Sequence, residues 1–271
     1  MRSFYFAATF IAMIGLPPLG DRFLAGCSFA QESPSTVSPG SLATTYAEVV
    51  QPHAQAALKR WEPTIAKMLR EDAKVPPDDQ SILFLGSSSI RLWDSLHHDL
   101  APYRCIQRGY GGARFTDLAV FAAPLIRPHR FRAVVIFVAN DIAGRASDLP
   151  ANDVIALLRY VRHVIADHQP EAEVFVIQIT PTQSRWDAWP AIANLNSRML
   201  DFCQTVPRTH FIATADAFLN HQGQVKAELF RDDKLHLNAA GYEVWAARIR
   251  KSLDEIFSPP VNSDTKSDIK Q

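Results

Sequence analysis

Two stretches of the sequence carry side chains that together could perform nucleophilic chemistry. Three consecutive serines at 87–89 follow Gly86, and Asp233 and His236 stand three residues apart near the C-terminus. At that spacing a carboxylate can hold the imidazole Nδ1–H, which leaves Nε2 free to act as a base on a hydroxyl. Each stretch also has a simpler interpretation. A serine run is more typical of a helix N-cap or a loop, and a His beside acidic residues is more typical of a solvated surface.

Two further stretches could stabilise the negative charge that forms when a hydroxyl attacks a carbonyl carbon. Gly109, Gly111 and Gly112 allow positive φ or close backbone approach, so their N–H groups could face an anion. Asn140 ends an apolar run, where its side-chain amide could donate a hydrogen bond to an oxyanion. A tight turn remains the simpler interpretation of the glycines, and a capped turn that of Asn140 with Asp141.

The hydrophobic pattern predicts a framework that could bring these segments together. Five short apolar runs have the pattern of buried strands, the last of them the weakest: 81–86, 105–109, 132–140, 172–180 and 210–218. Helical patterns lie between them, so the chain predicts a parallel sheet with helices on both faces. The ligand crevice of such a sheet lies at the carboxyl ends of its strands, which is where the serines, the glycines and Asn140 fall.

Three helical segments are predicted in more detail. The stretch 47–72 has a helical pattern that we expect Pro52 and Pro63 to interrupt. The stretch 152–168 and a final helix expected after Asn238 each place their apolar residues on one face. Asn238 is the expected N-cap of that final helix. These faces comprise Val154, Leu157, Leu158, Val161, Val164 and Ile165, then Tyr242, Trp245, Ala246, Ile249 and Leu253.

The composition argues against several classes of protein. The chain has 271 residues, 47% of them hydrophobic and 21% charged, which is typical of a globular domain. Lys plus Arg and Asp plus Glu both number 28, so no basic surplus predicts a nucleic acid partner. The three cysteines form no CxxC pair, and one His with one Asp supplies too few ligands for a metal, so we expect no metal site.

Both ends of the chain are predicted to lie outside the folded domain, which we place at 43–257 and which includes an N-terminal helical extension. Residues 1–30 have the early Arg and the apolar run of a secretory signal peptide. Cleavage after the small residues that precede Gln31 is favoured over lipidation at Cys27, which ends a lipobox-like LAGC. A retained membrane anchor is a further alternative. The Ser- and Pro-rich stretch 31–42 is a linker and 258–271 a flexible tail.

Taken together and in order, these segments resemble the SGNH (GDSL-type) hydrolase family across 79–256. The similar blocks are FLGSSSIRLW, RGYGGARFTDL, VAND and DDKLHLNAAGY, and the stretch 179–200 is similar too, including Asn196. The resemblance implies a three-layer α/β/α sandwich of flavodoxin-like type around a central parallel sheet of about five strands. It also selects one serine, because anchoring on Gly86 and Trp93 places the nucleophile at Ser88.

The same resemblance implies roles for the other residues. His236 would be the general base and Asp233 its orienting partner. The oxyanion hole would consist of the backbone N–H groups of Ser88 and Gly112 and the side-chain amide of Asn140. At two positions the chain departs from the family, with Ser at 87 where Asp is more frequent and Val at 138 where Gly is usual.

The activity implied is that of a secreted serine esterase that works through an acyl-enzyme on short-chain esters or carbohydrate O-acetyl groups. The partner would be a small-molecule or carbohydrate ester. No metal or organic cofactor is needed, and we expect membrane association only if Cys27 is lipidated. Two alternatives keep the same scaffold: a catalytically silent glycan-binding module and a lipase or lysophospholipase-type acylhydrolase. An α/β-hydrolase is disfavoured because the G-x-S-x-G elbow is missing, and a phosphatase because no metal-ligand cluster is present.

Overall fold

The computed structural model of the protein describes residues 46–74 and 76–257. The predicted signal peptide 1–30, with Cys27, lies outside the described residues, as do the linker 31–42 and the tail 258–271. The described residues fall within the domain predicted at 43–257, whose bounds stay a prediction.

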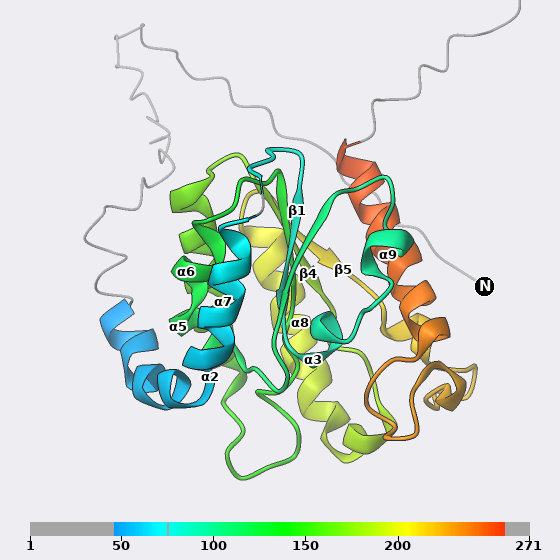
Figure 1. Cartoon of the computed structure of the whole chain (residues 1–271). Coiled ribbons are helices and arrows are strands. Elements are labelled where there is room, and N and C mark those ends of the chain that lie inside the picture. Colours follow the sequence, from blue (N-terminus) through cyan, green and yellow to red (C-terminus); the bar gives the residue numbers. More distant parts are fainter. Residues whose placement is uncertain (1–45, 75, 258–271) are drawn as a thin grey trace, which may run out of the picture. The chain divides into compact units, whose positions relative to one another are not determined.

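A parallel sheet of five strands forms the centre of the described part of the chain (Figure 1). The strands are β1 (Ile82–Gly86), β2 (Cys105–Gly109), β3 (Ala133–Phe137), β4 (Glu173–Ile177) and β5 (Thr209–Ile212). A strand lies in each of the five apolar runs, but the strand predicted at 210–218 was too long, since Ala215–Phe218 forms a 3-10 turn. Strands β1 and β3 are buried throughout, which is why their sequences are continuously apolar and do not alternate.

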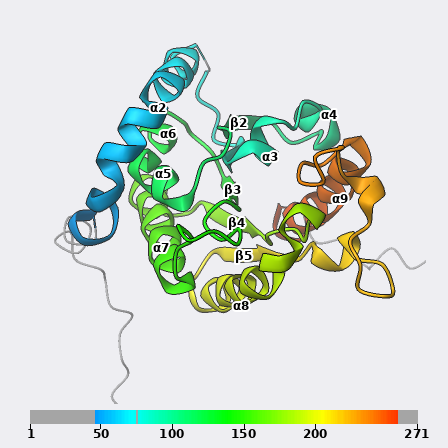
Figure 2. The same cartoon turned by 90° about the horizontal axis from the view of Figure 1, so that it is seen from below.

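Helices cover both faces of the sheet, so the predicted three-layer sandwich is confirmed (Figure 2). One face carries α5 (Phe115–Val120), α6 (Ala122–Ile126), α7 (Ala151–His168) and α8 (Trp189–Thr205). The other carries α3 (Ser88–Arg91), α4 (Leu96–Asp99) and α9 (Ala239–Phe257). Short 3-10 turns are η2 (Gln183–Ala188), η3 (Ala215–Phe218) and η4 (Ala227–Leu229).

The predicted apolar faces of the long helices are buried as expected. All six residues named in α7 and all five named in α9 are buried. Asn238 caps α9, because its Oδ1 accepts a hydrogen bond from the Gly241 N–H at 3.1 Å. In the described part of the chain, no helix combines the length and the apolar composition that crossing a membrane requires.

The expectation that proline interrupts the first helix was wrong for Pro63. After a π-helical turn at Tyr46–Val50, α2 (Gln51–Asp72) runs unbroken through Pro63. Proline in a helix interior removes one backbone hydrogen bond and crowds the preceding turn, so contacts elsewhere must hold the helix together. Helix α2 packs on α5 and α6, outside the α5–α7 layer (Figure 2), and its residues Ala57 and Ile65 are buried. Pro52 lies in the first turn, where its missing N–H costs nothing.

The strand order places a crevice beside β1. The order is β2-β1-β3-β4-β5, so the chain moves one way from β1 to β2 and the other way from β3 onward. A crevice forms at the carboxyl ends of the strands where that direction reverses. Gly86 pairs in register with Gly109 on one side and with Phe137 on the other, so the three strands end level with one another. The segments that follow them therefore meet at one edge of the sheet.

Candidate active site

Helix α3, which carries Ser88, packs directly across the end of β2. A Cβ added to Gly109 would lie 2.4 Å from the backbone nitrogen of Arg91 and 2.9 Å from the carbonyl carbon of Ile90. Only glycine permits so close an approach of backbone to backbone. The glycine at the end of β2 therefore positions the helix that follows β1, and with it the serine at the first helical position.

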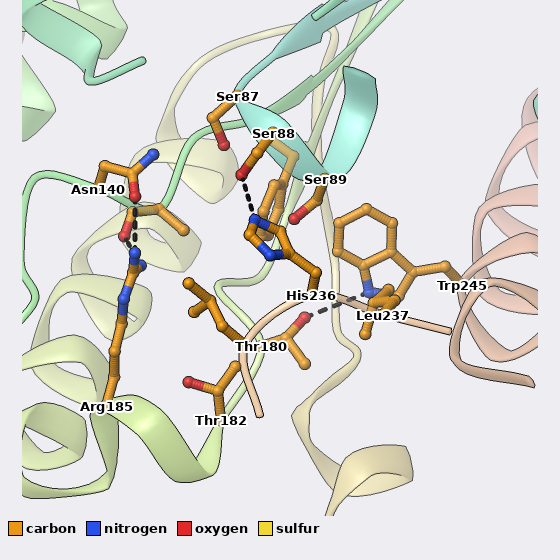
Figure 3. Close-up of a pocket in the computed structure, with 13 residues that line it drawn as sticks. Ser87, Ser88, Ser89, Asn140, Thr180, Thr182, Arg185, His236, Leu237 and Trp245 are labelled. Atoms are coloured by element: carbon orange, nitrogen blue, oxygen red, sulfur yellow. Dashed lines mark hydrogen bonds between the residues drawn. The ribbon is translucent and has the colours of Figure 1, made fainter. Parts of the chain in front are cut away.

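Ser88, His236 and Asp233 form a continuous hydrogen-bonded chain (Figure 3). The Oγ of Ser88 lies 2.9 Å from Nε2 of His236, and Nδ1 of His236 lies 2.6 Å from Oδ2 of Asp233. An ionised carboxylate only accepts hydrogen bonds, so Nδ1 carries the proton and Nε2 accepts the serine hydroxyl. This is the tautomer in which the imidazole can take a proton from Ser88.

The Asp233 carboxylate is held by its own turn. Its Oδ1 accepts hydrogen bonds from the backbone N–H groups of Leu235 and His236, each at 2.9 Å. Burial acts to raise the pKa of Asp233, but the hydrogen bonds from the His236 side chain and from the two backbone N–H groups outweigh it. The pKa is lowered to about 2. The group therefore stays ionised at neutral pH and can stabilise a protonated His236.

Three hydrogen bonds connect the Asp233–His236 turn and α9 to the rest of the site. The Tyr242 hydroxyl of α9 donates to the carbonyl of Ser89 at 2.8 Å. Arg231 donates to the carbonyl of Leu92 at 3.4 Å, and the backbone N–H of Ser184 donates to the carbonyl of Lys234 at 3.2 Å. The turn is thus fixed both to the serine helix and to the segment that follows β4.

Asn140 follows β3 and lies on the opposite wall of the cleft from His236 (Figure 3). The residue is buried, and its Nδ2 donates a hydrogen bond to the carbonyl of Ala113 at 2.8 Å. Ala113 adjoins Gly112, which has a φ of +78° in the turn after β2. The structure therefore brings Asn140 into the cleft beside Ser88 and next to the glycine turn.

The cleft has a cavity volume of about 20 Å³. It is lined by Ser87, Ser88, Ser89, Phe137, Ala139, Asn140, Thr180, Thr182, Arg185, Leu235, His236, Leu237 and Trp245. Gly112 is not among these residues, so its part in an oxyanion hole stays a prediction. A volume of this size accommodates a group about as large as one water molecule beside Ser88.

Four other residues of the segments that resemble the family lie outside the Ser88–His236–Asp233 hydrogen-bonded chain. Trp93 is fully buried and stacks on Tyr242. Arg91 is exposed. Ser87 is buried and its N–H donates to the carbonyl of Phe137 at 3.0 Å, while Val138 is buried in the core.

Arg185 is a lining residue that the sequence pattern did not single out. It lies in η2, after β4, and its guanidinium donates to Oδ1 of Asn140 at 2.6 Å and to the carbonyl of Ala139. The sequence could have indicated Arg185 because it follows a predicted strand, which is the criterion by which Asn140 was selected. The segment is anchored by Asn196, whose amide makes two hydrogen bonds to the backbone of Ile179, at 2.8 and 3.0 Å.

Across the described residues, no group of three or more His, Cys, Asp or Glu side chains is arranged to hold a metal ion. Cys105 and Cys203 are both buried and do not pair with each other.

The fold is similar to that of several solved structures. A Streptococcus pneumonia protein provisionally named a platelet activating factor is 20% identical, with a TM-score of 0.64 over 73% of this chain and 95% of that one. A GDSL-like lipase from Bacteroides thetaiotaomicron is 16% identical, with a TM-score of 0.61 over 70% of this chain and 97% of that one. A carbohydrate esterase of family 3 from Talaromyces cellulolyticus is 17% identical, with a TM-score of 0.50 over 65% and 97%. At these identities the likeness shows a shared fold.

At the level of sequence, the model of the GDSL-like Lipase/Acylhydrolase family matches residues 85–244, which is more than half of the chain. The match begins at the end of β1 and includes Ser88, Asn140, Asp233 and His236. No curated protein matches the chain.

Proposed function

Because the chain belongs to the GDSL-like lipase/acylhydrolase family and is a hydrolase of ester bonds, we propose that Ser88 is its nucleophile and that it forms an acyl-enzyme. The observation that carries the proposal is the hydrogen-bonded chain from Ser88 through His236 to Asp233, with Nε2 of His236 facing the hydroxyl. A serine hydroxyl is a weak nucleophile until a neighbouring base removes its proton.

The proposed reaction has two acyl-transfer steps. His236 takes the Ser88 proton as Oγ attacks the ester carbonyl carbon, and Asp233 stabilises the imidazolium that forms. The oxyanion receives hydrogen bonds from the Asn140 amide and from the backbone N–H groups of Ser88 and Gly112. The N–H of Ser88 is at the first helical position of α3, where a helix provides no acceptor of its own. His236 then protonates the leaving alcohol, and water repeats the attack on the acyl-enzyme.

We propose esters with a short acyl group, above all O-acetyl groups on carbohydrate, as the substrates. The space of about 20 Å³ beside Ser88 is consistent with a small acyl group such as acetyl. The likeness of fold to a carbohydrate esterase is consistent with a sugar as the alcohol part. Export through the predicted signal peptide is part of the same proposal.

The test is hydrolysis of a series of aryl esters of increasing acyl length, alongside acetylated polysaccharides. We expect activity to be highest with the acetyl ester and to fall as the chain lengthens. A preference for long acyl chains would favour a lipase-type acylhydrolase instead.

Three single variants test the assignment of the nucleophile. Ser88→Ala should abolish both hydrolysis and covalent labelling by a fluorophosphonate, with an unchanged circular dichroism spectrum. Ser89→Ala and Ser87→Ala serve as matched controls and should still be labelled. Labelling that survives in Ser88→Ala and disappears in either control would contradict the assignment. Absence of labelling in the wild type, together with glycan binding, would support the silent binding module.

A further inference from the structure

Arg185 binds two successive residues on the oxyanion side of the cleft. One guanidinium nitrogen donates to the side-chain Oδ1 of Asn140 at 2.6 Å, and the other donates to the backbone carbonyl of Ala139. Both acceptors lie in the segment that follows β3, and Arg185 itself follows β4. The contact therefore spans 45 residues of sequence and joins neighbouring strand ends.

These contacts determine which way the Asn140 amide faces. A guanidinium has only donors, so the atom that meets Arg185 must be the amide oxygen. The carbonyl of Ala113 has only acceptor capacity, so the atom that meets it at 2.8 Å must be the amide nitrogen. The oxygen and nitrogen of an amide are often hard to assign, but here both neighbours require the same orientation.

The orientation leaves one amide hydrogen for the reaction. Nδ2 carries two hydrogens, and the Ala113 carbonyl takes one of them. Figure 3 shows the nitrogen on the side of Ser87 and Ser88 and the oxygen on the side of Arg185. The second hydrogen therefore belongs to the half of the amide that faces the reacting serine.

We propose that Arg185 is a positioning residue, which holds the Asn140 amide with its N–H toward the oxyanion and strengthens that N–H as a donor. The inference rests on the proposed function of Asn140. The amide oxygen accepts a charge-assisted hydrogen bond, which draws electron density from the nitrogen and makes its hydrogens better donors. Without Arg185 only the Ala113 carbonyl fixes the orientation of the amide, which can then turn over more readily and present its oxygen to the developing negative charge, which is repulsive.

Arg185 is itself held in place by the backbone around it. The backbone N–H of Arg185 donates to the carbonyl of Thr182 at 3.3 Å, and the backbone N–H of Ser184 donates to the carbonyl of Lys234 at 3.2 Å. Lys234 lies within the Asp233–His236 turn. The segment that supplies Arg185 thus contacts both the oxyanion side and the base side of the site.

The experiment is a double-mutant cycle on the full chain with an aryl acetate. Asn140→Ala should lower kcat by about 100- to 1,000-fold, the usual effect of losing one oxyanion donor. We expect Arg185→Ala to lower kcat by roughly tenfold with little change in KM, because the interaction it supports is made only in the transition state. In the Asn140→Ala background, Arg185→Ala should change kcat by less than about twofold, since Arg185 acts through Asn140. Losses that multiply would overturn the proposal.

Two further variants separate positioning from folding. Arg185→Lys keeps the charge but cannot reach both acceptors with a planar fork, so it should recover only part of kcat. Arg145→Ala is the matched control, because Arg145 donates to the backbone carbonyl of Asn140 at 2.8 Å and leaves the amide untouched. We expect its kcat to stay within about threefold of wild type, because no oxyanion donor is lost. A loss equal to that of Arg185→Ala would contradict the inference.

The same measurements distinguish failure of this inference from failure of the proposed function. If Asn140→Ala retains full activity, then Asn140 is not an oxyanion donor and the proposed function is wrong at that residue. If Asn140→Ala is inactive and Arg185→Ala is fully active, only the positioning role is wrong. A variant that unfolds is recognised by its thermal transition, and Arg185→Lys then replaces it in the cycle.

Discussion

Replacing Asp233 with Asn should lower activity more than replacing it with Ala. In the wild type, Oδ1 of Asp233 accepts the N–H groups of Leu235 and His236, and Oδ2 accepts the Nδ1–H of the His236 ring. In Asp233→Asn the single remaining oxygen is the atom suited to the two backbone N–H groups. The new NH₂ then faces Nδ1, which must give up its proton and act as acceptor. The ring proton moves to Nε2, so His236 can no longer take a proton from Ser88.

The loss of activity expected for Asp233→Ala follows from the exposure of the Asp233 and His236 side chains, and that expected for Asp233→Asn follows from the tautomer. The Asp233 side chain is 47% exposed and that of His236 is 22% exposed, so water can partly replace the carboxylate. Discounted for this screening, the hydrogen bond to a charged imidazolium contributes about 1–2 kcal/mol, so Asp233→Ala should lower kcat/KM roughly 5- to 30-fold. The wrong tautomer of Asp233→Asn should lower it by roughly 10⁴-fold, as in other serine hydrolases in which the acid was changed to its amide.

The assay is hydrolysis of an aryl acetate between pH 7 and 8, with kcat and KM measured for the wild type and both variants. Because the pKa of Asp233 is about 2, its carboxylate stays ionised throughout this range and its own charge is constant during the comparison. Burst titration gives the concentration of active sites and excludes residual wild-type enzyme. Activity of Asp233→Asn equal to or above that of Asp233→Ala would refute the reasoning about the tautomer.

Three further outcomes are expected. Burial raises the pKa of Asp141 to about 7, well above its usual value of about 4. The folded state is therefore destabilised relative to the unfolded state by an amount that grows as the pH rises from about 4 to about 7. The difference in Tm between Asp141→Asn and wild type should therefore increase with pH across this range, and a flat difference would count against it. Gly109→Ala should lower the free energy of unfolding by about 1–3 kcal/mol and also reduce kcat, because the new Cβ displaces α3; unchanged urea denaturation would argue against the close approach. Burial raises the pKa of the Cys105 and Cys203 thiols to about 12, so neither should react with iodoacetamide at pH 8 until the protein unfolds, as mass spectrometry of each thiol would show.

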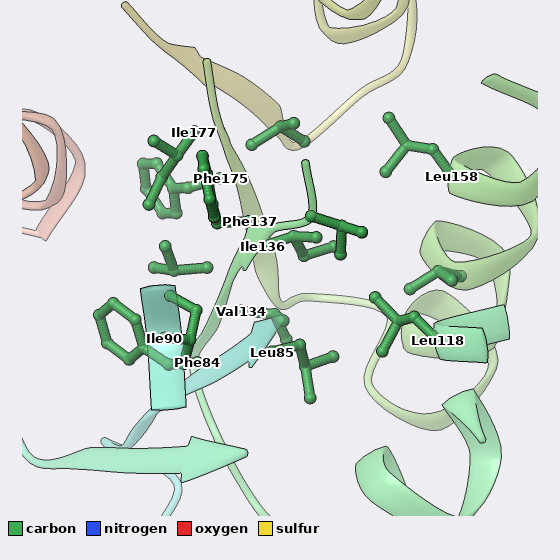
Figure 4. Close-up of a cluster of buried hydrophobic side chains, with 14 of the residues drawn as sticks. Phe84, Leu85, Ile90, Leu118, Val134, Ile136, Phe137, Leu158, Phe175 and Ile177 are labelled. Atoms are coloured by element: carbon green, nitrogen blue, oxygen red, sulfur yellow. The ribbon is translucent and has the colours of Figure 1, made fainter. Parts of the chain in front are cut away.

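The sheet could be predicted because burial on two faces leaves a plain mark on the sequence. In β1, Phe84 points to the side of Ile90 on α3 and Leu85 to the side of Leu118 on α5 (Figure 4). Successive residues of such a strand point to opposite faces of the sheet, and because both faces are buried, all of them must be apolar. This produces the continuous apolar run from which the strand was predicted. The polar residues that follow each run were then placed at one edge by topology alone.

Other features depend on contacts that no local pattern records. Pro63 predicts a break, but the packing of α2 on α5 and α6 outweighs that preference. Arg185 has no periodic or motif signal, because its contact with Asn140 is made across two strand ends. Gly112 was assigned to the oxyanion hole by resemblance to the family. The structure shows its positive φ but does not place it among the residues that line the cleft.

The hydroxyl of Ser88 and the imidazole of His236 are 148 residues apart in the chain, and this has a consequence for inactivation. The Asp233–His236 pair is local and can persist within its own turn, but it meets Ser88 only while the final segment stays docked on α3. Separation of the pair requires the Tyr242–Ser89, Arg231–Leu92 and Ser184–Lys234 hydrogen bonds to open, but none of the hydrogen bonds within the sheet. Local opening of this kind is less costly than melting of the sheet. Catalytic competence should therefore be lost at a lower temperature than the central strands, whose amides should remain protected from hydrogen exchange after activity has gone.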